Sequence, residues 1–130
     1  MIVVDASVVL ELVLQTSRSP AIAARIAAPT ETLHAPHVID LEVAQVLRRF
    51  VRARSLPEGR AAQALADFRD LPVVRYPHTL LLDRVWELHR NATAYDGAYL
   101  ALAEALDAPL LTADRRLRGI PRLQARVELV

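Results

Sequence analysis

The sequence predicts an α/β fold, a three-layer α/β/α sandwich whose central, mostly parallel sheet has four or five strands. Short apolar runs alternate with helical segments along the whole chain, which is typical of parallel sheets joined by right-handed crossovers. The chain has 130 residues, of which 53% are hydrophobic and 24% are charged. Because this length suits one globular unit, and no linker or repeat interrupts the alternation, we expect a single domain over residues 1–130.

The first half of the chain contains two candidate strands and three candidate helices. Residues 1–4 form an apolar, β-branched run, as expected of a strand that is buried on both faces. From Val38 to Arg54 the apolar side chains recur at helical spacing and form one stripe. The expected elements are a strand at 1–4, helices at 6–14 and 20–28, a weak strand at 33–35 closed by Pro36, and a helix at 38–54.

The second half continues the alternation. Pro57 suits the first turn of a helix, where its missing N–H group would have no partner in any case. The segment from Thr79 to Arg90 is amphipathic, and Pro109 opens a short apolar run. The expected elements are a helix from Pro57 to about Asp70, a strand at 72–76, helices at 79–90 and 95–106, a strand at 109–112, a helical turn from Arg115, and a candidate fifth strand at 126–129.

Composition and charge exclude several kinds of site. The chain has no cysteine, which excludes disulfide frameworks, zinc–cysteine sites and cysteine nucleophiles. All 16 basic residues are arginine, so any mechanism that needs a lysine is excluded. The formal net charge of +1 argues against bulk attraction to polyanions. Because no apolar run approaches the roughly 20 residues of a membrane helix, and the start lacks the features of a signal peptide, we expect a soluble, cytoplasmic protein with no membrane contact.

Four carboxylates stand at positions that a parallel sheet brings together. Asp5 and Asp114 each follow a predicted strand, whereas Glu42 and Asp96 each lie in the first turn or so of a predicted helix. Sites in open parallel sheets form in the crevice at the carboxyl ends of the strands. We therefore expect the four side chains to converge there.

Each of these carboxylates also has a structural explanation. Acids at a helix N-terminus are stabilised by unpaired N–H groups and the helix dipole, by about 0.3–1 kcal/mol. Asp5 and Asp114 suit N-caps, and the segment from Thr93 to Asp96 resembles a capping box. Glu42 flanks the apolar stripe of its helix, where a partly covered carboxylate needs an arginine or a metal ion as its partner. A solvated glutamate is an equally good interpretation of that position.

Taken together, the four acids predict a metal site. Carboxylates that lie close together repel one another unless cations lie among them. Oxygen ligands without histidine or cysteine suit Mg²⁺ or Mn²⁺ rather than zinc, and the four histidines of the chain show no ligand-type grouping. Such a site suits the hydrolysis of phosphodiesters by metal-activated water.

Four segments of the chain together resemble one protein family. They are Met1-Ile2-Val3-Val4-Asp5-Ala6-Ser7-Val8, Asp40-Leu41-Glu42-Val43, Tyr95-Asp96-Gly97-Ala98-Tyr99-Leu100-Ala101-Leu102-Ala103 and Leu111-Thr112-Ala113-Asp114. Their combination resembles PIN-domain proteins, and in particular the VapC-type toxins of bacterial toxin–antitoxin (VapBC) systems. One departure is Gly97, where the family more often has alanine; glycine disfavours a helix by about 1 kcal/mol relative to alanine.

The resemblance implies an activity and a set of partners. The activity is that of an endoribonuclease, a hydrolase that depends on Mg²⁺ or Mn²⁺. The implied partners are an RNA substrate, a cognate VapB-type antitoxin and a second copy of the chain in a homodimer. A PIN nuclease of RNA processing, or an RNA-binding module without a toxin role, is the alternative that remains.

The same resemblance assigns roles to individual residues. It places four acids in the catalytic metal site, with Asp5 and Asp96 as central ligands and Glu42 and Asp114 completing or orienting the site. Two small polar residues match positions that support the carboxylates through hydrogen bonds, namely Ser7 and Thr112.

Arginines next to the predicted site are candidates for contacts with RNA phosphates. Arg115, Arg116 and Arg118 follow Asp114 directly, where guanidinium groups suit bidentate binding of phosphate. A solvated surface is the alternative interpretation of this group. For the arginines at 48, 49, 52 and 54, a solvated face at the end of a helix is the favoured interpretation.

Two other classes of protein with aspartates at strand ends fit less well. A receiver-type signalling module needs a lysine after a late strand, and this chain has no lysine. An aspartate-nucleophile phosphatase needs a second aspartate two residues after the first, where this chain has Ser7.

Overall fold

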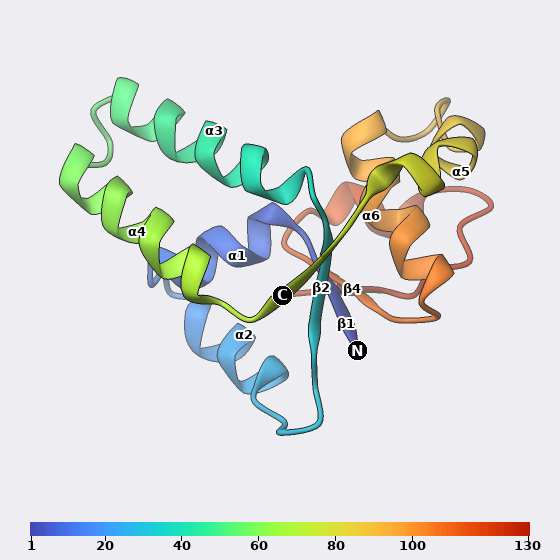
Figure 1. The fold of residues 1–130 in the computed structure, drawn as a ribbon, viewed down its shortest axis with the longest axis horizontal. Helices are drawn as coiled ribbons and strands as arrows, with labels where there is room; N and C mark the ends of the chain where they lie inside the picture. Colours follow the sequence, from blue (N-terminus) through green and yellow to red (C-terminus); the bar gives the residue numbers. More distant parts are fainter.

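Five parallel strands form one sheet through the middle of the molecule (Figure 1). The computed structural model describes residues 1–130. The strands are β1 (Ile2–Val4), β2 (Leu33–Pro36), β3 (Val73–Tyr76), β4 (Leu110–Thr112) and β5 (Val127–Leu129), in the spatial order β3-β2-β1-β4-β5. Every neighbouring pair is parallel, so the sheet is wholly parallel rather than mostly parallel. The expected α/β architecture is confirmed, including the fifth strand.

The strand order creates a crevice beside the central strand. The chain runs outward from β1 through β2 to β3, and then crosses to the other side of β1 to form β4 and β5. Open α/β sheets bind ligands at such a reversal, outside the carboxyl ends of the strands. Val4 pairs with Leu111 in the β1–β4 register, and the Asp5 N–H group donates to the Leu111 carbonyl over 3.4 Å. The residues that follow β1 and β4 are therefore neighbours.

Helices cover both faces of the sheet, so the central strands are buried on both sides (Figure 1). On one side lie α1 (Ala6–Val13), α2 (Ser19–Ile26), α3 (Ile39–Arg52) and α4 (Glu58–Asp70). On the other side lie α5 (Leu82–Glu87) and α6 (Ala94–Ala105). Two 3-10 turns complete the fold, η1 (His78–Leu81) and η2 (Arg115–Gly119). None of these helices combines the length and the apolar character that a membrane-spanning segment needs.

The core is one continuous cluster of 30 buried apolar residues. Its centre is formed by the side chains of β1 and β4, of which none is more than 1% exposed among Ile2, Val3, Val4, Leu110 and Leu111. Burial on both faces explains why these strands read as unbroken apolar runs in the sequence rather than as alternating ones.

The helix expected over residues 79–90 differs most from the structure. Its first turn is the 3-10 turn η1, and the α-helix that follows ends at Glu87. The α-helix ends early because the His89 N–H group donates to the Trp86 carbonyl, three residues back instead of four. Trp86 is 70% exposed, so its ring lies outside the core.

Gly97 has a packing role that the sequence did not indicate. It is buried in the first half of α6, directly against α5. A Cβ atom at this position would lie 3.3 Å from Cγ1 of Val85, which is closer than side chains normally approach. The glycine therefore allows α5 and α6 to pack closely, which offsets its unfavourable effect on helix formation.

One ionic cluster joins α5, α6 and the segment before β5. Arg84 donates two hydrogen bonds to the Glu104 carboxylate, over 2.7 and 3.0 Å, and the Gln124 N–H group donates a third over 2.8 Å. Burial alone would raise the pKa of Glu104, but these hydrogen bonds outweigh it and hold that pKa below its usual range. Arg84 also pairs with Glu87, which is exposed.

We expect Glu104→Gln to lower the free energy of unfolding at pH 7 by about 1–2 kcal/mol, because the bidentate bond to Arg84 is lost. Since the pKa of Glu104 is depressed in the folded protein, its contribution is present above the pKa of a free glutamate and is lost as the pH falls through the depressed value. Urea denaturation of both proteins between pH 7 and pH 3 measures this difference and its disappearance.

Glu87→Gln is the matched control, because it removes the same charge from the same arginine at an exposed position. We expect it to cost about 0–1 kcal/mol. Equal losses for the two variants would contradict the role assigned to the Glu104 cluster.

Candidate active site

Asp5 occupies the junction between β1 and α1, at the crevice of the sheet. Its backbone is extended, and it forms the N-cap of α1 by accepting a hydrogen bond from the Val8 N–H group over 3.1 Å. The structural interpretation of Asp5 as a cap is thus confirmed. The cap uses one oxygen of the carboxylate, however, and the other oxygen points to a different strand.

Ser7 and Thr112 both donate hydrogen bonds to Asp5. Ser7 Oγ reaches Oδ1 over 2.5 Å, and Thr112 Oγ1 reaches Oδ2 over 2.5 Å. The two hydroxyls also accept hydrogen bonds, Ser7 from the Ala113 N–H group and Thr112 from the Asp114 N–H group, each over 2.9 Å. This network holds the β1–α1 junction to the β4–η2 junction and fixes the orientation of Asp5.

Asp5 is a buried carboxylate with no cation beside it. It is only 7% exposed, and no arginine lies within ion-pair distance of it. Burial raises the pKa of Asp5 above its usual range, and the hydrogen bonds from Ser7 and Thr112 counteract only part of this effect. A buried charge without a counterion is costly, so this position is prepared for a positive ligand.

Glu42, in the first turn of α3, faces the same crevice. Tyr99 of α6 donates a short hydrogen bond to Glu42 Oε2. Burial raises the pKa of Glu42, and the charges of Asp96 and Asp5 raise it further, so all three carboxylates act on one another. The side-chain partner of Glu42 is therefore a tyrosine, where the sequence suggested an arginine or a metal ion.

Tyr99 is a member of the site that the sequence analysis missed. It is 2% exposed, and burial next to Glu42 raises the pKa of its hydroxyl, which therefore stays protonated and acts as a donor. The signal was present in the spacing, because residues three apart on a helix share a face and Tyr99 lies three residues after Asp96.

Asp96 lies in the first turn of α6. The N-cap of this helix is Thr93, whose hydroxyl accepts a hydrogen bond from the Asp96 N–H group over 3.1 Å. No hydrogen bond from the Thr93 N–H group to the Asp96 carboxylate is present, so only half of the capping box suggested by the sequence is formed. The Asp96 carboxylate has no ion-pair partner and stays available to a ligand.

Asp114 stands apart from the other three acids, because it is paired with Arg116. Arg116 donates to both oxygens of the carboxylate, over 2.5 to 3.0 Å, and these bonds lower the pKa of Asp114. The backbone N–H group of Arg116 donates to the same carboxylate, so Asp114 forms the N-cap of η2. Arg116 thus differs from Arg115 and Arg118, which have no carboxylate partner and line a hollow of about 580 Å³ near the C-terminus.

The donor atoms at the crevice suit a hard divalent cation. No three acidic or histidine side chains lie close enough together to hold an ion as they stand. Even so, Asp5, Glu42 and Asp96 influence one another electrostatically, none has a cationic partner, and Asp5 is buried. All the available donors are oxygens, which favours Mg²⁺ or Mn²⁺ over zinc.

A largely apolar groove of about 920 Å³ opens beside these acids. It runs between α1 and α3, and Ser7 and Glu42 belong to its wall together with Leu10, Leu41 and Phe50. Two residues of the candidate site thus contribute to the wall of the groove.

Comparisons with known proteins agree with this architecture. A family model described as PIN domain matches residues 2–123. VapC ribonuclease Mb0985 of Mycobacterium bovis is 41% identical over 130 residues, which cover 100% of this chain and 98% of that protein. Among solved structures, VapBC2 from Rickettsia felis, bound to a promoter DNA fragment, aligns with a TM-score of 0.72 at 13% identity, covering 99% of this chain and 98% of that one.

A second solved structure is similar in fold. VapC20 of Mycobacterium tuberculosis, described as a toxin that cleaves the sarcin-ricin loop, has a TM-score of 0.70 at 16% identity and covers 97% of this chain and 99% of its own. At such identities the structures support the fold, whereas the full-length match at 41% identity and the family model establish the family. The chain therefore belongs to the PIN-domain family and, within it, to the VapC ribonucleases.

Proposed function

We propose that this chain is an endoribonuclease that hydrolyses RNA phosphodiesters at the crevice between β1 and β4, as the toxin of a type II toxin–antitoxin module. The observation that carries the proposal is the buried Asp5 carboxylate, which lies at the crevice within electrostatic range of Glu42 and has no arginine partner. Membership of the VapC ribonucleases supports the reaction type, and these enzymes generally depend on a divalent metal. We also propose that it acts in the cytoplasm, which an RNA substrate supports.

The acids have distinct roles in this proposal. Asp5 and Asp96 hold the divalent cation, Mg²⁺ or Mn²⁺, and Glu42 and Asp114 complete or orient its surroundings. When bound, the cation lowers the pKa of water and neutralises charge at the scissile phosphate. Ser7 and Thr112 orient the Asp5 carboxylate through their hydrogen bonds, which favour its ionised form against the effect of burial. Tyr99 positions Glu42 through its hydroxyl.

Arg116 would compete with a metal ion for the Asp114 carboxylate. The pair makes Asp114 unavailable to a cation unless Arg116 turns away, and Arg116 is almost fully exposed and free to do so. We propose that Arg116 leaves Asp114 for an RNA phosphate when substrate binds, whereas Arg115 and Arg118 are free to contact phosphates at once.

The groove between α1 and α3 suits a protein partner. It is apolar and reaches the candidate site through Ser7 and Glu42, so an occupant would block access to the acids. The solved relatives include toxin–antitoxin complexes, among them one from Klebsiella pneumoniae. We propose that a cognate VapB-type antitoxin binds this groove with an apolar segment. This partner distinguishes the toxin from an RNA-processing nuclease or a module that only binds RNA.

A second apolar surface suits contact between two copies of the chain. Leu80, Leu82 and Trp86 lie together in η1 and α5 and are 89%, 53% and 70% exposed. Large apolar side chains clustered at the surface mark contact sites more often than isolated ones do. We propose that this surface forms the interface of a homodimer of single-domain chains.

The function is tested by the digestion of total RNA with purified Asp96→Asn and wild-type protein, in the presence of Mg²⁺, Mn²⁺ or EDTA. We expect discrete fragments from the wild type that require metal. For Asp96→Asn we expect cleavage to fall by more than about 100-fold, since changes to the partners of metal ligands already cost roughly 10- to 100-fold. End-sequencing of the fragments identifies the target RNA.

Asp107→Asn is the matched control. Asp107 is exposed and has a left-handed backbone, with φ of 48°, which asparagine tolerates. We expect full activity from this variant and equal melting temperatures for all three proteins. A folded Asp96→Asn protein with full activity would contradict the role of Asp96, and a folded wild type without cleavage at any metal concentration would contradict the nuclease.

We expect Tyr99→Phe to reduce RNA cleavage by about 10-fold and to raise the Mg²⁺ concentration for half-maximal rate, because Glu42 loses the hydroxyl that orients it. Tyr95→Phe, on the same helix but 59% exposed, serves as the control and should change neither quantity by more than about 2-fold. A metal titration of the cleavage rate measures both variants. An unchanged titration for Tyr99→Phe would remove Tyr99 from the site.

We expect the double variant Leu80→Asp, Trp86→Ala to be monomeric and the wild type dimeric in size-exclusion chromatography with light scattering. Introducing a charge and removing the large ring eliminates the apolar contact. Ala62→Asp, which adds the same charge on the exposed side of α4, should remain dimeric. A dimeric double variant would place the interface elsewhere.

A further inference from the structure

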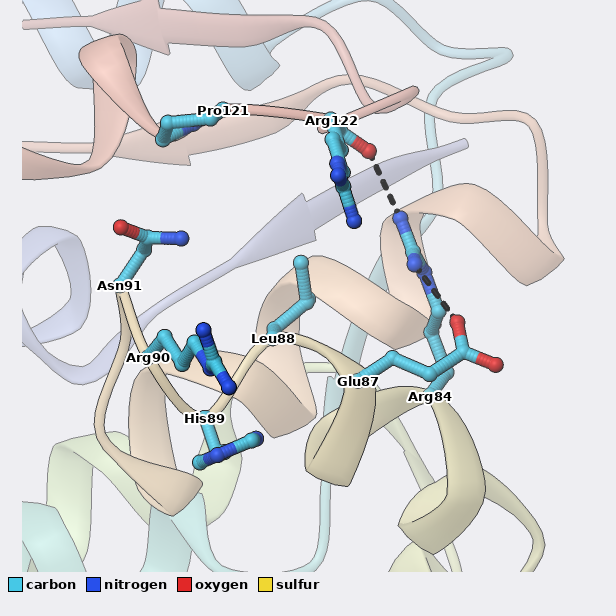
Figure 2. A pocket seen from close by; sticks show the side chains of 8 residues that line it. All are labelled: Arg84, Glu87, Leu88, His89, Arg90, Asn91, Pro121 and Arg122. Carbon is cyan, nitrogen blue, oxygen red and sulfur yellow. Dashed lines mark hydrogen bonds and ion pairs between the residues drawn. The ribbon is translucent and has the colours of Figure 1, made fainter.

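A basic pocket of about 700 Å³ lies away from the candidate active site (Figure 2). One wall is formed by α5 and the residues that follow it, and the other wall is formed by the loop after η2. Arg84, Glu87, Arg90, Asn91 and Arg122 are among the residues that line it. None of them belongs to the acid cluster, and the function proposed above gives them no role.

Two of the three arginines in this pocket have no negatively charged partner. Arg84 is fully engaged, since its guanidinium donates to Glu104, to Glu87 and to the Arg122 carbonyl. Glu87 is the only acidic residue of the lining, and it shares Arg84 with Glu104, which lies outside the lining. Neither Arg90 nor Arg122 has a carboxylate within ion-pair distance. The three arginines and these two glutamates leave an excess of one positive charge, and the guanidinium groups of Arg90 and Arg122 have no carboxylate partner.

The free donors of the pocket come from two segments of its lining. Figure 2 shows the Arg122 side chain extending from its loop toward Leu88, with Arg90 and Asn91 on the opposite segment. The side-chain amide of Asn91 makes no hydrogen bond within the protein. The bonds from Arg84 to Glu87 and to the Arg122 carbonyl appear as dashed lines. Two guanidinium groups and one amide are therefore available to a ligand that is an anion and a multiple acceptor.

The main chain around the pocket is held in place before any ligand binds. Arg122 has a left-handed backbone, with φ of 62°, and its carbonyl is held by Arg84 over 2.8 Å. Two residues later, the Gln124 N–H group is bound by Glu104. On the opposite segment, the N–H groups of residues 91 and 92 both donate to the Leu88 carbonyl. A ligand would not have to order these segments, which favours binding.

Both walls of the pocket are continuous with segments of the candidate active site. The wall formed by residues 88–91 leads into α6, whose first turn contains Asp96. The wall formed by residues 121 and 122 follows η2, which Asp114 caps. The pocket is thus built by residues that are close in sequence to the segments that carry Asp96 and Asp114.

We propose that this pocket binds a phosphodiester group of the RNA substrate at a position outside the scissile bond, through Arg90, Arg122 and Asn91. The planar, always charged guanidinium is suited to bidentate contact with phosphate. A pocket of this volume accommodates a nucleotide-sized group. Contacts to phosphate position a strand without reading its sequence, so the pocket contributes affinity rather than base specificity. The inference rests on the proposed ribonuclease function.

The test compares the double variant Arg90→Gln, Arg122→Gln with the wild type in binding a fluorescein-labelled, 20-nucleotide single-stranded RNA, measured by anisotropy in EDTA to prevent cleavage. We expect the affinity to fall by about 10-fold or more. The slope of log affinity against log salt should decrease by about 0.7, since the pocket holds one phosphate and each phosphate contact on a single strand contributes about 0.7. In cleavage assays with Mg²⁺, KM should rise while kcat is unchanged.

The matched control is the double variant Arg52→Gln, Arg69→Gln. Both residues are exposed, lack carboxylate partners and lie on α3 and α4, on the opposite side of the sheet (Figure 1). It makes the same change in net charge, and we expect it to alter affinity by less than about 2-fold. The variant Arg90→Lys, Arg122→Lys should keep the salt slope but recover only part of the affinity, because lysine keeps the charge and loses the planar fork.

Three results would overturn the inference. If the wild type binds and cleaves RNA and the double variant behaves like the control, the proposed function stands and the pocket has no part in it. If the wild type neither binds nor cleaves RNA, the proposed function and the inference both fail. If a 5′-mononucleotide or inorganic phosphate occupies the pocket while RNA affinity is unaffected by the double variant, the ligand is a small molecule. Thermal melting verifies folding, and the two single variants replace the double variant if it melts early.

Discussion

The burial of one carboxylate, Asp5, organises the functional half of this molecule. Its two oxygens receive hydrogen bonds from a hydroxyl on its own helix and from a hydroxyl on β4. These bonds join the two strands at which the order of the sheet reverses. They do not remove the cost of burying the charge, because burial still raises the pKa of Asp5. The fold thus maintains an unfavourable group at the one position where a ligand of opposite charge would relieve the cost.

Other parts of the structure follow from the need to surround this crevice with rigid elements. α6 is buried from Gly97 to Ala103, and Gly97 allows α5 to pack closely against it. The Arg84–Glu104 cluster fixes the distal end of the same helix to the chain that enters β5. It also holds the Arg122 carbonyl. The stability of α6 and the presentation of the basic pocket therefore depend on the same ion pair.

The sequence predicted the parallel sheet, the helical layers and the family, because burial on both faces leaves unbroken apolar runs and because the four acidic segments are distinctive. It predicted less about which side chains contact one another. Tyr99 looked like another apolar member of a helix, since the sequence does not show which side chains meet across α3 and α6. Arg116 looked like a free cation, although it forms an ion pair with Asp114, two residues away. Trp86 could be core or interface, and only tertiary packing decides that its ring is exposed.

The double use of Asp5 as helix cap and candidate ligand has an evolutionary consequence. Asparagine is as good an N-cap as aspartate, and it removes the buried charge. An Asp5→Asn chain would therefore keep the cap of α1 while losing the charge that the proposed metal role requires. A cell lineage that escapes its own toxin through this codon would still make a well-folded protein with its groove intact. Such a protein would still bind the antitoxin through the proposed groove. The mutated gene would therefore lower the amount of free antitoxin in the cell, although it no longer encodes an active toxin.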